Sequence, residues 1–134
     1  MTSRPHDFLP ALGRALDTLR AARSEVTPDR RLGRTQLGFR ELLRYESSPD
    51  FKESERPVLE EARLQAVRFL MNGIADESFG EPAVWTKYFL FLSVEAAETR
   101  ELLEVREPAV SDTWERFAER LPEMMDETLG LTKN

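Results

Sequence analysis

Apolar residues recur every three or four positions along most of this chain, and this spacing places them on one side of a helix. The first such stripe contains Leu9, Leu12 and Leu16, with charged residues away from it. Prolines and turn-forming residues interrupt the pattern at intervals, so the chain divides into several helices. We therefore expect an all-α fold, a single compact bundle of about five helices over residues 1–134, with residues 1–6 frayed at the end.

Capping residues and prolines mark where these helices begin. Thr27-Pro28 is one start signal, although Gly33 and Gly38 weaken the helix that follows it, so we expect regular helix there only from about residue 35. Ser54 and Ser111 are further candidate caps. Pro122 is expected to kink the last helix. The expected helices are at about 8–24, 35–46, 54–76, 82–106 and 111–129.

The helix expected near 82–106 is the most hydrophobic. Its residues 84–94 are apolar on almost every side, which is typical of a helix surrounded by its neighbours. The same run is rich in aromatic residues and also suits a strand. Residues 96–105 continue with good helix formers and no turn signal, and this favours a central buried helix.

Composition excludes several kinds of chemistry. The chain has no cysteine, which rules out disulfides, thiolate nucleophiles and zinc–thiolate sites. Its one histidine, His6, lies in the segment expected to be frayed, and no glycine-rich phosphate loop is present. These features favour a protein that is not an enzyme, and we expect no cofactor.

No segment has the length of a membrane span. The longest apolar run, 88–92, is far shorter than the roughly 20 residues that cross a bilayer, and 33% of the residues are charged. The polar residues 1–7 do not resemble a secretory signal. We expect a cytoplasmic protein that does not contact a membrane.

The aromatic residues of the central segment form the first candidate site. In a helix they cannot all face one core, so part of the cluster is predicted to be an apolar patch that a partner or a second subunit covers. The alternatives are a fully buried helix and a small-ligand pocket. This predicted interaction patch consists of Phe69, Trp85, Tyr88, Phe89 and Phe91.

A cluster of arginines is the second candidate. Residues 1–44 carry nine arginines against five acidic residues, a net charge of +4, whereas residues 45–134 carry ten basic and twenty acidic residues, a net charge of −10. Such a cluster suits nucleic-acid binding, although the total charge of −6 opposes it. Pairing with acidic residues of the C-terminal half is the alternative. This basic patch consists of Arg30, Arg31, Arg34, Arg40 and Arg44.

Carboxylates offer a third possibility. Glu98 and Glu101, and also Glu123 and Asp126, are each one helical turn apart, and two such pairs on facing helices could hold Mg²⁺. This spacing resembles that of the all-helical nucleotide pyrophosphohydrolases, but the double glutamate that opens their motif is missing here. The alternative is that these residues form the solvated faces of two helices.

The leading hypothesis is a non-catalytic helical protein–protein interaction module: an adaptor, a regulator or a subunit of an assembly, with homodimerisation as one form. The second is a small nucleic-acid-binding regulator that uses the basic patch. The third is a Mg²⁺-dependent nucleotide hydrolase that uses the four carboxylates. The sequence alone identifies neither the partner nor any ligand.

Overall fold

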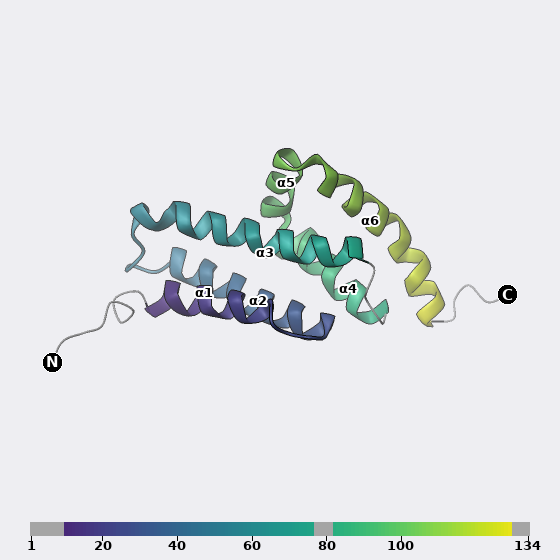
Figure 1. Ribbon diagram of the computed structural model, residues 1–134, viewed down its shortest axis with the longest axis horizontal. Helices are drawn as coiled ribbons and strands as arrows, with labels where there is room; N and C mark the ends of the chain where they lie inside the picture. Colours follow the sequence, from purple (N-terminus) through teal and green to yellow (C-terminus); the bar gives the residue numbers. More distant parts are fainter. Residues whose placement is uncertain (1–9, 77–81, 130–134) are drawn as a thin grey trace. The chain divides into compact units, whose positions relative to one another are not determined.

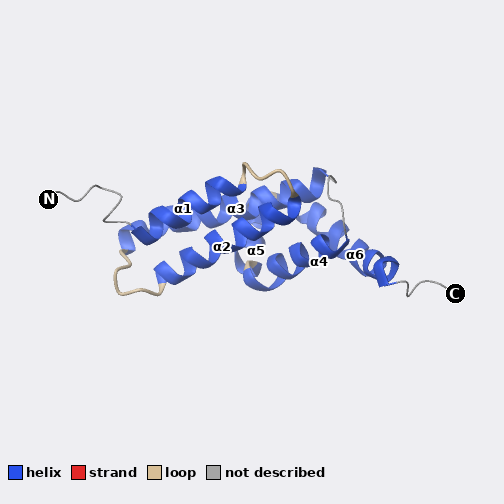
Figure 2. Cartoon of the chain, turned by 90° about the horizontal axis from the view of Figure 1, so that it is seen from below, coloured by secondary structure: helices blue, strands red, loops and turns tan. Residues whose placement is uncertain are grey.

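The computed structural model describes residues 10–76 and 82–129, and within them the chain is helical and contains no strand (Figure 2). The predicted all-α fold is confirmed, and residues 84–94 are helical. No helix in these ranges is long and apolar enough to cross a membrane. The α-helices are α1 (Pro10–Ala22), α2 (Pro28–Glu46), α3 (Arg56–Asp76), α4 (Pro82–Leu90), α5 (Ala97–Arg106) and α6 (Pro108–Leu129), with a 3₁₀ turn η2 (Glu53–Glu55) and a π-helical turn η3 (Phe91–Glu95) (Figure 1).

The chain forms two compact units that divide within α3. The N-terminal unit, Met1–Ala66, contains α1, α2, η2 and the first half of α3. The C-terminal unit, Val67–Asn134, contains the second half of α3, then α4, η3, α5 and α6. The single domain expected from the chain length stays a prediction.

Helix α2 begins seven residues earlier than expected, at Pro28. Thr27 is its N-cap, and its side chain accepts a hydrogen bond from the backbone N–H of Arg30 at 3.3 Å. Pro28 fits the first position because its missing N–H would have no partner there. The two glycines made the early start look unfavourable, but the cap and the packing of the helix outweigh their cost of about 1 kcal/mol each.

Two predicted caps are wrong. Ser54 lies inside η2, whose own N-cap is Lys52, and α3 follows directly with Pro57 in its first turn. Helix α6 begins at Pro108, so Ser111 is already inside it. In both places a proline lies in the first turn of the helix, where its missing N–H costs no hydrogen bond. Helix α6 continues through Pro122, and the predicted kink there stays a prediction.

The helix expected over 82–106 is not continuous. Helix α4 ends at Leu90, and the next turn is π-helical, with the N–H of Ala96 bonded to the carbonyl of Phe91 at 2.8 Å. Ala96 then leaves helical geometry, and α5 begins after it. No glycine or proline marks this break, because it depends on a side chain further along the chain, described below.

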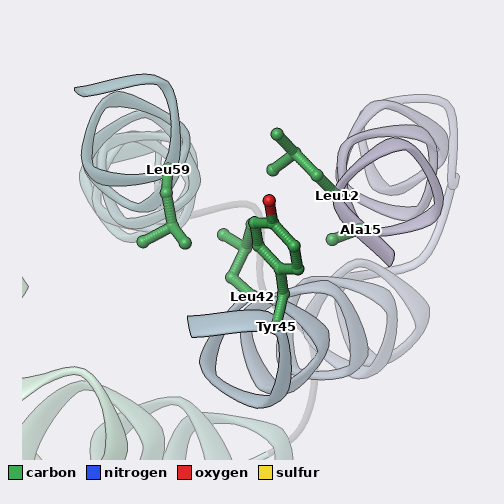
Figure 3. Close-up of a cluster of buried hydrophobic side chains, with 5 residues drawn as sticks. All are labelled: Leu12, Ala15, Leu42, Tyr45 and Leu59. Atoms are coloured by element: carbon green, nitrogen blue, oxygen red, sulfur yellow. The ribbon is translucent and has the colours of Figure 1, made fainter. Parts of the chain in front are cut away.

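The N-terminal unit has a core built from three helices. Leu12 and Ala15 of α1, Leu42 and Tyr45 of α2, and Leu59 of α3 are all buried and point toward one another (Figure 3). The hydroxyl of Tyr45 donates to the Glu55 carboxylate, which satisfies the polar end of the buried ring. Burial and this hydrogen bond raise the pKa of Tyr45.

Gly38 allows α1 and α2 to pack closely along their length (Figure 1). A Cβ atom at this position would lie 2.7 Å from Cγ and Cδ2 of Leu19 and 3.3 Å from the carbonyl oxygen of Ala15. These distances are shorter than van der Waals contact, so a larger residue at this position would displace the Leu19 side chain and press on the carbonyl of Ala15. Gly33 is different, because a Cβ there would have no neighbour within 4 Å.

The two glycines form a matched pair for testing this packing. We expect Gly33→Ala to raise the free energy of unfolding by about 1 kcal/mol, since alanine favours the helix and meets no neighbour. We expect Gly38→Ala to lower it by about 1 kcal/mol, because overpacking outweighs the same gain in helix propensity. Urea unfolding of the two variants checks this, and equal stabilisation by both would show that α1 and α2 do not pack this closely.

Glu46 joins the end of α2 to α3 through two arginines. Its carboxylate lies 2.5 Å from Nη2 of Arg63 and 2.6 Å from Nη1 of Arg56. The hydrogen bonds, first from Arg63 and then from Arg56, hold the pKa of Glu46 below its ordinary value of 4.5. The Arg63 side chain is only 15% exposed, so this pair is shielded more than a surface pair.

The lowered pKa of Glu46 predicts a loss of stability in acid. A carboxylate with a folded pKa below its unfolded pKa stabilises the fold above the unfolded value, and this contribution disappears as the pH falls through the folded pKa. We expect Glu46→Gln to cost about 1–2 kcal/mol at pH 7 and much less at pH 3, measured by urea unfolding. The exposed Glu60→Gln on α3 is the control, and an equal cost of Glu46→Gln at both pH values would refute the assignment.

Candidate interaction surface

One side of α2 faces solvent and carries most of the predicted basic patch. Its positions recur at spacings of three and four, which align them along the helix. All five residues on it are exposed, and Leu37, in the middle of the row, is 51% exposed. We call this surface the α2 arginine face: Arg30, Arg34, Leu37, Arg40 and Arg44.

Glu25, in the connection before α2, contacts the first two arginines. Its carboxylate lies 2.5 Å from Nε of Arg34 and 3.9 Å from Nη1 of Arg30, and its side chain is only 17% exposed. Arg34 is therefore held by a hydrogen bond, whereas the exposed Arg30 only lies near the same carboxylate. One carboxylate does not neutralise both arginines, and the pair keeps a net positive charge.

Arg31, the fifth member of the predicted patch, points elsewhere. Its Nε donates to the carbonyl of Glu25 at 2.9 Å and its Nη2 to the carbonyl of Val26 at 2.8 Å. It therefore stabilises the connection before α2 and is half-buried. The sequence left open that these arginines pair with acidic residues of the C-terminal half. Three of them, Arg30, Arg31 and Arg34, instead contact the connection before α2, within their own unit.

Glu41 is the acidic residue closest in sequence to the middle of this face. It is half-buried, and its Oε1 atom is buried without a hydrogen-bond partner. The α2 arginine face thus presents four arginines against the carboxylates of Glu25 and Glu41, a formal net charge of +2. The α2 arginine face is therefore a cationic row with the exposed Leu37 at its centre.

The predicted aromatic interaction patch is mostly interior. Trp85, Tyr88 and Phe91 are buried, and Phe69 and Phe89 are half-buried. The exposed side of the same run carries Leu90 and Val94, which are 54% and 70% exposed. Sequence reasoning missed these two aliphatic residues because it considered the aromatic rings alone. The exposed Lys87, three residues before Leu90 and seven before Val94, marks the same side of the chain.

The aromatic rings of α4 pack on α6 inside the C-terminal unit. The rings of Phe89 and Trp114 stack nearly parallel with their centroids 5.3 Å apart, and those of Trp85 and Phe117 lie 5.1 Å apart. Such pairs add about 0.5–1.5 kcal/mol each beyond the burial of their area. These rings therefore act first as the core between α4 and α6, and the patch that they were predicted to form stays a prediction.

Arg100 of α5 is buried against this aromatic cluster. Its Nε donates to the carbonyl of Leu92 at 2.8 Å, and its Nη1 pairs with the carboxylate of Glu104. Its guanidinium lies 4.3 Å from the centroid of the Trp114 ring. The π-turn allows the first contact, because the N–H of Ala96 binds Phe91 and leaves the Leu92 carbonyl to the arginine.

Arg100 is expected to be one of the most sensitive positions of the C-terminal unit. Arg100→Met leaves Glu104 and the Leu92 carbonyl without their partner, and we expect a loss of about 3 kcal/mol in the free energy of unfolding. Arg106→Met, at an exposed arginine of the same helix, should change it by less than about 0.5 kcal/mol. Chemical denaturation compares the two, and similar losses would mean that the buried contacts do not hold the π-turn.

The carboxylates of the third hypothesis do not form a described metal site. Glu98, Glu101 and Glu123 are exposed, and the side chain of Asp126 lies outside the described residues. Among the residues that the structure describes, no group of three or more histidine, cysteine, aspartate or glutamate side chains could hold a metal ion. His6 also lies outside the described residues.

A small pocket of about 220 Å³ opens in the C-terminal unit. The rings of Trp85 and Phe117 line it together with Ile74, and Arg116 and Arg120 of α6 lie at its polar side. This volume is below the roughly 300–1,000 Å³ of typical small-molecule sites. The pocket is therefore a weaker candidate than the α2 arginine face.

The chain was compared with known protein families, with curated proteins and with solved structures, and none of them matches it. A functional assignment therefore depends on the surfaces described above.

Proposed function

We propose that this chain is a non-catalytic, cytoplasmic protein–protein interaction module, an adaptor, a regulator or a subunit of an assembly, that binds through the α2 arginine face. One observation carries this proposal: Leu37, 51% exposed, lies in the middle of a row of four arginines. An exposed aliphatic residue surrounded by oriented charges matches the pattern of an interface, in which a small apolar contact is bordered by polar groups.

The rigidity of the face supports the same function. The opposite side of α2 is packed against α1 at Gly38 and into the core at Leu42, so the helix cannot rotate to hide Leu37. Glu25 holds Arg34 in place before any partner binds. Side chains that are already ordered lose less conformational entropy on binding, which favours affinity. Arginine is also enriched at protein interfaces.

A nucleic-acid-binding regulator is the second candidate. Its support is that four of the five predicted arginines share one exposed side of a helix, over about 21 Å from Arg30 to Arg44 at a rise of 1.5 Å per residue. Phosphate groups would bind such a row. Leu37 favours the protein partner, because an aliphatic side chain in the centre of the row has no favourable contact with a phosphate backbone.

Site-specific photocrosslinking tests the proposed function. Leu37 is replaced by the photoreactive residue p-benzoylphenylalanine, and the same replacement at Val58, which is 48% exposed on α3, is the control. In extract of the native host treated with nuclease, we expect a protein adduct at position 37 and not at position 58. Arg30→Ala with Arg44→Ala should lower its yield about tenfold, which corresponds to about 1.4 kcal/mol.

Each other outcome decides against the proposal. Adducts of equal yield at positions 37 and 58, or an adduct that does not depend on the arginines, would mean that the α2 arginine face is not the binding surface. An adduct that disappears with nuclease would transfer the assignment to nucleic-acid binding.

A further inference from the structure

A row of carboxylates on α6 complements the α2 arginine face. The four residues recur at spacings of three, four and four, so they align on one side of the helix. All four are exposed, and Arg116 lies beside them. We call this surface the α6 acidic face: Asp112, Glu115, Glu119 and Glu123.

The two faces match in length as well as in sign. Asp112 to Glu123 spans about 17 Å of helix, and the row of cations on α2 spans about 21 Å. Four carboxylates with one neighbouring arginine leave the α6 acidic face with a formal charge of −3, against +2 on the α2 arginine face. Opposite charges of similar extent are what steers two surfaces together.

We propose that the partner of the α2 arginine face is the α6 acidic face of a second copy of this chain. The inference rests on the proposed function and names the partner. In an antiparallel pairing of the two helices, Arg30 and Arg34 lie opposite Glu123 and Glu119. Leu37 then lies opposite the middle of the α6 acidic face, where the methylene groups of Arg116 provide apolar surface.

Because every copy carries both faces, two copies can exchange two such contacts. A symmetric pair of contacts is the usual arrangement of a homodimer. The second contact forms within an already associated pair, so its effective concentration is high. Two contacts that would each be weak on a solvated surface can therefore act together.

Salt is the first test. Charged contacts at a surface are screened at high ionic strength. We expect sedimentation velocity to detect a dimer at 50 mM NaCl, with a Kd at least about tenfold weaker at 500 mM NaCl. A protein that is monomeric at 50 mM NaCl up to about 1 mM, or a dimer whose affinity does not depend on salt, would overturn the inference.

Charge reversal on each face is the second test. One variant carries Arg30→Glu with Arg34→Glu, and the other carries Glu119→Arg with Glu123→Arg. Each variant alone should lose self-association by at least about tenfold, because its reversed face repels the unchanged face of its twin. A mixture of the two should restore dimers, since each reversed face then meets a reversed face and each unchanged face meets an unchanged one.

The matched control reverses two arginines on α1, Arg14→Glu with Arg20→Glu, which are exposed and outside both faces. It changes the net charge as much as the α2 variant and should dimerise like the unmodified protein. Loss of dimers in this control would show an effect of net charge alone and would overturn the inference.

The mixture keeps the test decisive if a variant is less stable, because restored dimers require both variants to fold. A mixture that stays monomeric overturns the inference, and so does pairing of the two faces within one chain, which predicts no rescue by mixing. In both cases an arginine-dependent protein adduct at position 37 would leave the proposed function intact with a different partner.

Discussion

A guanidinium group taken out of water organises the C-terminal unit. Arg100 is only 9% exposed, and burying its charge is favourable only because three neighbours replace the lost water: the Leu92 carbonyl, the Glu104 carboxylate and the face of Trp114. Each neighbour comes from a different place along the chain. The arginine thereby links the π-turn, α5 and α6, and it takes up the Leu92 carbonyl that the π-turn leaves open after α4.

In the N-terminal unit, close packing on one side of α2 determines which residues remain on its other side. Gly38 lets α2 approach α1 until atoms touch, and Thr35 beside it is buried, with its hydroxyl bonded to the carbonyl of Arg31 at 2.7 Å. The charged and long side chains of α2 that do not fit against α1 lie on the opposite side of the helix. The row of arginines and Leu37 is therefore a product of how tightly the inner side is packed.

The periodicity of apolar residues was sufficient to predict the fold class, the positions of most helices and most of the core. Thr27 and Pro28 signalled the start of α2, but regular helix was expected only from about residue 35. Helix propensity treats Gly33 and Gly38 as costs, and it cannot see the neighbouring helix against which Gly38 packs. Periodicity could not predict the π-turn, since Arg100 acts on Leu92 through a contact eight residues away. In a run that is apolar on almost every side, the aromatic pattern also did not separate the inward rings of α4 from the outward Leu90 and Val94.

The candidate surface was predictable in part for the same reasons. A cluster of arginines is visible in the sequence, and its placement on one helix follows from spacing. Arg31 instead donates to the carbonyls of Glu25 and Val26. These hydrogen bonds depend on the local backbone conformation, which the spacing of residues does not predict. The exposure of Leu37 becomes known only when the inner side of α2 is known.

The π-turn also has a consequence for the length of the chain. Between Phe91 and Ala96 the backbone closes a hydrogen-bonded ring one residue larger than that of an α-helix. A deletion of one residue within 93–95 would turn the bond between Ala96 and Phe91 into an ordinary helical one, and the N–H of Ala97 would then lie four residues after Leu92 and bind its carbonyl. Arg100 would then lose its acceptor, and the residues after it would face a different direction. Among related sequences, this short segment should therefore tolerate exchanges of apolar side chains far better than gaps.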